Sequence, residues 1–174
     1  MSHSRIFQLR TERMDIKNGD ERVTADYFVD NNCFIGPIAD YVSDDCNPRE
    51  DFEDLTEFFQ NVLGEGYETH FTHHYDENDT AIPEAYITFR PGFKKAYFKE
   101  QYAAFLKLVE KTSLENFMDR FYIGSLEEAI RDKFNFYVAE GDDVYLCPID
   151  TFLRGLPDDE EITYWLWGTV DYHY

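Results

Sequence analysis

The stretch ITYWLWGTVDYHY, residues 162–174, decides the fold that we expect for this chain. In an extended strand, successive side chains point to opposite faces. One face then carries Tyr164, Leu166, Val170 and Tyr172, and the other carries Trp165, Trp167, Thr169, Asp171 and His173. Bulky side chains on both faces are typical of a central strand covered on both sides, or of an edge strand that presents tryptophan to a partner. We favour the central strand.

Five earlier segments also alternate between polar and apolar residues or are short and apolar, and they predict further strands. They are Ser4–Arg10, Tyr67–Tyr75, Ala85–Arg90, Asn135–Ala139 and Val144–Ile149. Polar connections at 76–80 and 140–143 predict two β-hairpins. Residues Val23–Ile38 fit two short apolar segments around a turn.

Helical spacing and capping residues predict helices at Asn47–Leu63, Lys94–Lys111, Leu114–Phe121 and Leu126–Phe134, with a helical turn at Thr151–Leu153. The last two full helices rest on two capping-box patterns, Thr112-x-x-Glu115 and Ser125-x-x-Glu128. No linker or repeat divides the chain. We therefore predict one α+β domain over residues 1–174, with an antiparallel sheet of roughly five to seven strands and three to four helices packed on it.

The charge is strongly unbalanced, because 36 Asp and Glu face 16 Lys and Arg, for a formal net charge of −20 over 174 residues. Hydrophobic residues make up 43% of the chain and aromatic residues 18%, which is typical of a folded domain rather than of a disordered acidic tail. Such a charge opposes binding to nucleic-acid phosphates and to anionic lipids, and it favours basic protein surfaces. The alternative is that the charge only keeps an aromatic-rich protein soluble.

The acidic residues are clustered. Residues 40–57 hold eight acids against Arg49, and residues 140–161 hold eight against Arg154, so each stretch has a net charge of −7. Displayed on one surface, these carboxylates would attract proteins that bind DNA through Lys and Arg. The predicted partner-binding residues are Asp44, Asp45, Asp51, Glu53, Asp54, Glu57, Asp158, Asp159, Glu160 and Glu161. An ordinary solvated face is the alternative for either stretch alone.

Residues 90–111 reverse the sign, with a net charge of +4 and five interleaved aromatic residues. Basic and aromatic residues together can indicate nucleic-acid contact. We favour a helix that buries its aromatic residues while its lysines balance acidic neighbours in the same molecule or in a partner.

The histidines His70, His73 and His74 are weak candidates for a metal site, since imidazole is a common zinc ligand. On a strand, however, His70 and His74 lie about 13 Å apart and His73 faces the other way. We therefore predict no metal, no cofactor and no catalytic residue. Three cysteines without a Cys-x-x-Cys pair, and no leader or membrane segment, favour a cytoplasmic location.

In composition alone, the chain is similar to anti-restriction DNA mimics and other small acidic inhibitors of nucleic-acid enzymes. The similarity implies a non-catalytic acidic protein that engages a basic surface, and it transfers no residues. Two alternatives stay open. One is an enzyme with an unrecognised histidine and carboxylate site. The other is an accessory domain that forms a homo-oligomer through the Trp165 and Trp167 face.

Overall fold

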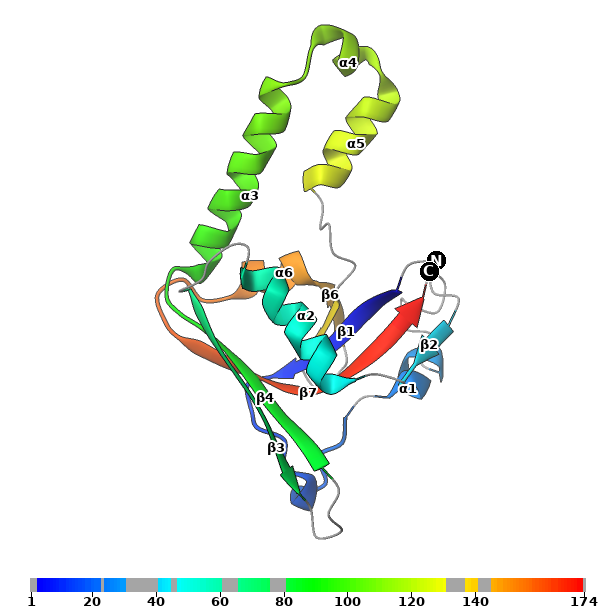
Figure 1. Cartoon of the computed structure of the whole chain (residues 1–174), viewed down its shortest axis with the longest axis vertical. Coiled ribbons are helices and arrows are strands. Elements are labelled where there is room, and N and C mark those ends of the chain that lie inside the picture. The colour runs from blue at the N-terminus through cyan, green and yellow to red at the C-terminus, as the bar shows by residue number, and fades with distance from the viewer. Residues whose placement is uncertain are drawn as a thin grey trace.

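Strand β7 (Ile162–His173) lies in the centre of a seven-stranded mixed sheet in the computed structural model (Figure 1). The structure describes residues 3–22, 24–30, 41–44, 47–60, 66–75, 81–130, 137–140 and 145–173. The strand order is β3 (Tyr67–Tyr75), β4 (Ala81–Phe89), β7, β1 (His3–Arg10), β5 (Tyr137–Glu140) and β6 (Tyr145–Pro148). The short strand β2 (Tyr41–Ser43) pairs with the far end of β7.

All pairs in this sheet are antiparallel except β1 with β5. The α+β class and the two hairpins, β3–β4 and β5–β6, are confirmed. The predicted antiparallel sheet is confirmed for most of its pairs, and the exception is β5, which the chain reaches from β4 after three helices and which lies parallel to β1.

A shift of register in the middle of β7 changes which face each residue occupies. Gln8 pairs with Gly168 and Leu9 with Leu166, so Trp167 is the additional residue of a β-bulge. The predicted common face of β7 is therefore divided. Tyr164 and Leu166 pack in one apolar cluster, and Val170 and Tyr172 pack in the other.

The larger cluster lies under three helices on one face of the sheet (Figure 1). The helices are α2 (Pro48–Gln60), α3 (Phe93–Glu110) and α6 (Ile149–Gly155). Their buried side chains are Phe52, Leu55, Phe93, Tyr97, Ile149, Phe152 and Leu153. These pack against strand residues that include Phe7, Leu9, Ile87, Phe89 and Val138. The opposite face is covered in part by α1 (Ala25–Asp30), whose Phe28 packs on Ile6, Val170 and Tyr172. The sheet is thus covered on both faces, and the central position predicted for β7 is confirmed.

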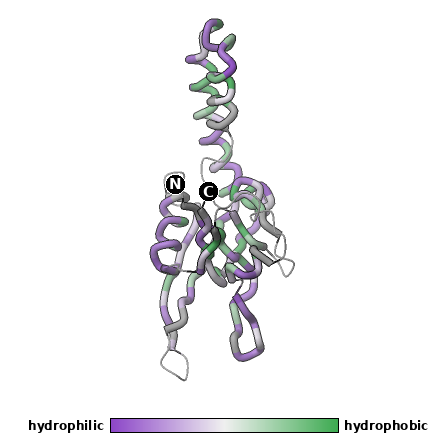
Figure 2. The backbone as a smooth tube through the Cα atoms, turned by 90° about the vertical axis from the view of Figure 1, so that its right-hand side faces the viewer, coloured by the Kyte–Doolittle hydropathy of each residue, from purple (hydrophilic) through white to green (hydrophobic). Residues whose placement is uncertain are grey.

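The helices α3, α4 (Leu114–Met118) and α5 (Arg120–Ile130) project from the sheet as a hairpin, which we call the helical arm (residues 93–130; Figures 1 and 2). We call the rest of the chain the body. Asp119 caps α5, because its Oδ1 accepts a hydrogen bond from the Phe121 amide at 2.9 Å. The predicted helix start at Ser125 is therefore wrong, since α5 already runs through that position.

Two other expectations change. Residues 25–30 form a helix instead of a short apolar segment before a turn, and residues 31–38 of that prediction lie outside the described residues. Ser113 rather than Thr112 caps α4, by accepting a hydrogen bond from the Asn116 amide at 3.1 Å. A short 3-10 turn at Ile16–Asn18 completes the secondary structure.

Candidate functional site

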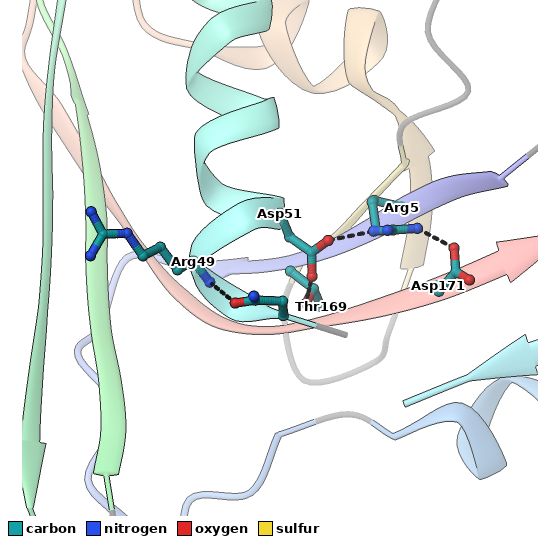
Figure 3. Close-up of polar contacts among 6 residues, drawn as sticks. Arg5, Arg49, Asp51, Thr169 and Asp171 are labelled. Carbon is teal, nitrogen blue, oxygen red and sulfur yellow. Dashed lines mark hydrogen bonds and ion pairs between the residues drawn. The ribbon is translucent and has the colours of Figure 1, made fainter. Parts of the chain in front are cut away.

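Asp51, one of the predicted partner-binding acids, lies in the interior with 1% of its surface exposed. It accepts a hydrogen bond from Arg5 Nε and another from Thr169 Oγ1 at 2.8 Å (Figure 3). The Arg5 guanidinium also forms an ion pair with Asp171. The three elements α2, β1 and β7 are joined here by one network.

This network is structural, and the surface role predicted for Asp51 is wrong. A buried carboxylate is tolerated when opposite charge and hydrogen-bond donors surround it, and Arg5 and Thr169 supply both. Asp51 falls on the inner side of α2 together with Phe52 and Leu55, while its neighbours Glu53 and Asp54 turn outward. Helical periodicity places it there, but its partners are distant in the sequence.

The other acids of α2 lie on its exposed side. Glu53, Asp54 and Glu57 are all exposed. Glu53 accepts a hydrogen bond from Arg49 Nε at 2.9 Å, an exposed pair of residues four apart on the helix. Such pairs contribute only about 0.3–0.5 kcal/mol, so Glu53 can exchange Arg49 for a partner at little cost.

The second predicted group, Asp158, Asp159, Glu160 and Glu161, is exposed in the loop between α6 and β7. Asp158 lies at the base of the helical arm, because its carboxylate is 3.3 Å from Lys94 Nζ and its carbonyl accepts a hydrogen bond from the Gly92 amide. This loop therefore helps to position α3 and also displays carboxylates.

Asp44 is exposed and accepts a hydrogen bond from the Ala25 amide at 2.9 Å, so it also stabilises the start of α1. Asp45 lies outside the described residues. The eight exposed members of the predicted set are thus divided between α2, the 158–161 loop and Asp44, on separate elements of the body.

The predicted tryptophan face is covered by the chain itself. Trp167 is buried, and its Nε1 donates a hydrogen bond to the Glu12 carbonyl at 2.8 Å. The guanidinium of Arg10 lies 4.3 Å from the centre of the Trp167 ring, and that of Arg13 lies 5.7 Å from the Trp165 ring. The end of β1 and the residues after it therefore lie against the tryptophans through which the accessory-domain alternative would self-associate.

His70 and His73 lie against different aromatic rings. His70 stacks on Tyr86 with ring centres 5.0 Å apart, and His73 meets the edge of Phe71 at 5.1 Å. His74 belongs to β3, but its side chain lies outside the described residues. Within the described part of the chain, no group of three His, Cys, Asp or Glu side chains could hold a metal ion.

Tyr67 joins α2, β3 and the base of the arm. Its hydroxyl donates to the Thr56 carbonyl at 3.0 Å, and its ring meets Phe93 edge to face. Burial raises the pKa of Tyr67 above the ordinary value of 10.0, because desolvation disfavours the phenolate. The contact with Phe93 helps to hold the start of α3 on the sheet.

Sequence reasoning missed the exposed apolar surface of the arm. Of the eight large hydrophobic side chains that are exposed in the described part of the chain, only Tyr75 lies outside the arm. The others are Tyr102, Leu106, Val109, Leu114, Phe117, Met118 and Phe121. The spacing of Leu114, Phe117, Met118 and Phe121 was a signal, but it is equally typical of a helix that is buried.

Comparison with known proteins leaves the chain without an assigned family, since no family model, no curated protein and no solved structure matches it. No helix in the described residues is long and apolar enough to span a membrane.

Proposed function

We propose that this protein is a non-catalytic binding protein whose acidic body engages a basic partner surface, and that DNA-handling enzymes are the partner class to test first. The observation that carries the proposal is the distribution of charge between body and arm. Residues 93–130 hold six Lys or Arg and six Asp or Glu, so their net charge is zero. The body therefore carries the whole −20.

The exposed carboxylates support this role. Those of α2 and of the 158–161 loop lie on a body whose fold is stabilised by an apolar core and by the Arg5–Asp51 network. Removing exposed charges should therefore change binding without unfolding the protein. Electrostatic complementarity of this kind raises association rates and is weakened by salt.

The test is competition with duplex DNA for a panel of DNA-cleaving and DNA-modifying enzymes. For an enzyme that is inhibited, added duplex DNA should relieve inhibition, and affinity should fall more than about tenfold between about 50 and about 200 mM salt. Affinity that does not change with salt would contradict the proposal.

A pair of matched variants separates body from arm. The triple variant Glu53→Gln, Asp54→Asn and Glu57→Gln removes three exposed charges from α2. The control, Glu100→Gln, Glu110→Gln and Asp119→Asn, removes three exposed charges from the arm and keeps a capping oxygen at residue 119. The α2 variant should weaken binding about tenfold or more, and the arm variant much less. Equal loss in both would show that total charge, and not the body surface, determines binding.

A further inference from the structure

We propose that the helical arm is a self-association surface, through which two copies of this chain pack with their arms antiparallel about a two-fold axis. This inference is independent of the acidic surface of the body. It depends on three features of the arm, namely its exposed apolar stripe, its neutral total charge and the order of charges along its length.

The exposed face of α3 changes character from base to tip. Lys95, Lys99, Tyr102, Leu106 and Val109 are all exposed and recur at intervals of three or four residues, which places them on one side of the helix. The stripe is basic near the body and apolar farther along the arm. Contiguous exposed apolar surface on a soluble protein marks a place of contact.

The other side of α3 is already occupied within the arm. Thr112 at the end of α3 makes a hydroxyl contact of 3.2 Å with Tyr122 of α5. Phe105 and Leu108, which lie on the same side as Thr112, are partly buried. The exposed stripe is therefore a second apolar face, which the α3–α5 hairpin does not cover.

The tip continues the apolar surface and holds it in a defined conformation. Leu114, Phe117, Met118 and Phe121 are between 63% and 80% exposed. The caps supplied by Ser113 and Asp119 organise the backbone that carries them. These large side chains are thus presented to the outside by an ordered turn.

A second copy fits this surface because the charges along the arm are self-complementary. Residues 93–111 have a net charge of +3, and residues 114–130 have a net charge of −3. An antiparallel arrangement with its axis near Leu106 places the apolar stripes against each other. It also brings Glu115 of each copy toward Lys95 and Lys99 of the other. A two-fold interface requires this self-complementarity, whereas an unrelated partner does not.

Charge also explains why the arm, and not the body, would make this contact. Two bodies of −20 repel each other, but the neutral arm does not add to that repulsion. Helix α3 has 18 residues and is about 27 Å long, so antiparallel arms keep the two bodies at opposite ends.

The experiment measures the mass of the full chain by sedimentation equilibrium over a range of concentrations. The wild type should form dimers, and Leu106→Ser with Val109→Ser, in the part of the stripe that lies at the two-fold axis, should weaken dimerisation at least about tenfold. Tyr75→Ser, which removes an exposed hydrophobic side chain of the body, is the matched control and should leave the dimer intact. Circular dichroism checks that all variants are folded.

A charge exchange tests the antiparallel arrangement itself. Lys95→Glu with Lys99→Glu places acids opposite Glu115, and Glu115→Lys places a lysine opposite Lys95 and Lys99, so each variant alone should dimerise more weakly. Mixed together, the two variants should form a heterodimer, because both charge contacts are then favourable. A mixture that stays monomeric would reject this arrangement.

Two results would overturn the proposal. One is a wild-type chain that is monomeric at every concentration. The other is a monomeric chain that sediments with zwitterionic lipid vesicles and loses this binding in a Phe117→Ser and Met118→Ser variant, because the apolar tip would then be a lipid-binding surface.

Discussion

The body and the helical arm use the same kinds of residue in opposite ways. In the body, large apolar side chains are buried in two clusters and the net charge is −20. In the arm beyond its base, large apolar side chains are exposed and the charges cancel. The difference shows that the net charge comes from the body alone, whereas among the described residues nearly all exposed large apolar side chains belong to the arm.

The largest change in stability that tests this comparison is expected for a substitution in the body, at Asp51. Asp51→Ala leaves Arg5 without one of its carboxylate partners and removes the acceptor of the Thr169 hydroxyl. We expect a loss of about 3–5 kcal/mol in the free energy of unfolding, measured in urea.

The matched control is Asp54→Ala, three residues along the same helix and exposed, with an expected change within about 0.5 kcal/mol. Equal effects at the two positions would contradict the structural assignment of Asp51.

A smaller change in the free energy of unfolding should distinguish the base of the arm from its exposed part. Tyr97 is 1% exposed and its hydroxyl donates to Asp150 Oδ1 at 3.1 Å, whereas Tyr102 in the same helix is 60% exposed. Tyr97→Phe should cost about 0.5–1.5 kcal/mol in urea unfolding, and Tyr102→Phe almost nothing. A larger loss for Tyr102→Phe would mean that the exposed part of α3 is packed against the body.

The smallest change in the free energy of unfolding is expected at Tyr67, where the body meets the arm, and it should appear at alkaline pH. The raised pKa means that the unfolded chain loses this proton first, at about pH 10, while the folded chain still holds it. The stability that depends on the neutral phenol is fully present below pH 10 and is lost as the pH rises through the higher pKa of the folded state.

Tyr67→Phe removes that dependence together with the hydrogen bond to the Thr56 carbonyl. The wild type should therefore be the more stable protein at about pH 8, and the difference should shrink by about pH 11. A difference that stays constant across this range, measured by urea unfolding, would contradict the assignment.

Much of the body could be predicted from local pattern. The alternation in Tyr67–Tyr75 and Ile162–His173 and the capped helix after Asn47 are signals within a few residues, and all three elements form. The split of β7 between two faces could not be predicted, because the bulge at Trp167 is defined only by pairing with β1. At Gly168 a β-carbon would lie 3.3 Å from the β-carbon of Arg22. Because these residues are far apart in the chain, this close approach could not be predicted from the sequence.

The candidate sites were harder to predict than the strands. Asp51 reads as one acid among many until Arg5, 46 residues earlier, is placed beside it. The apolar residues of the arm look like a core, since spacing alone does not say whether a helix is covered. Their exposure depends on where α3 leaves the sheet.

By itself, the sequence determined the net charge of −20, the α+β class and most helices and strands, because composition, periodicity and capping act within a few residues. Only the tertiary structure decided which carboxylate is buried, which face of β7 meets which helix, and that the arm extends from the sheet with an apolar face exposed. Those outcomes depend on contacts between residues far apart in the chain, and no local pattern encodes which distant residue will be the partner.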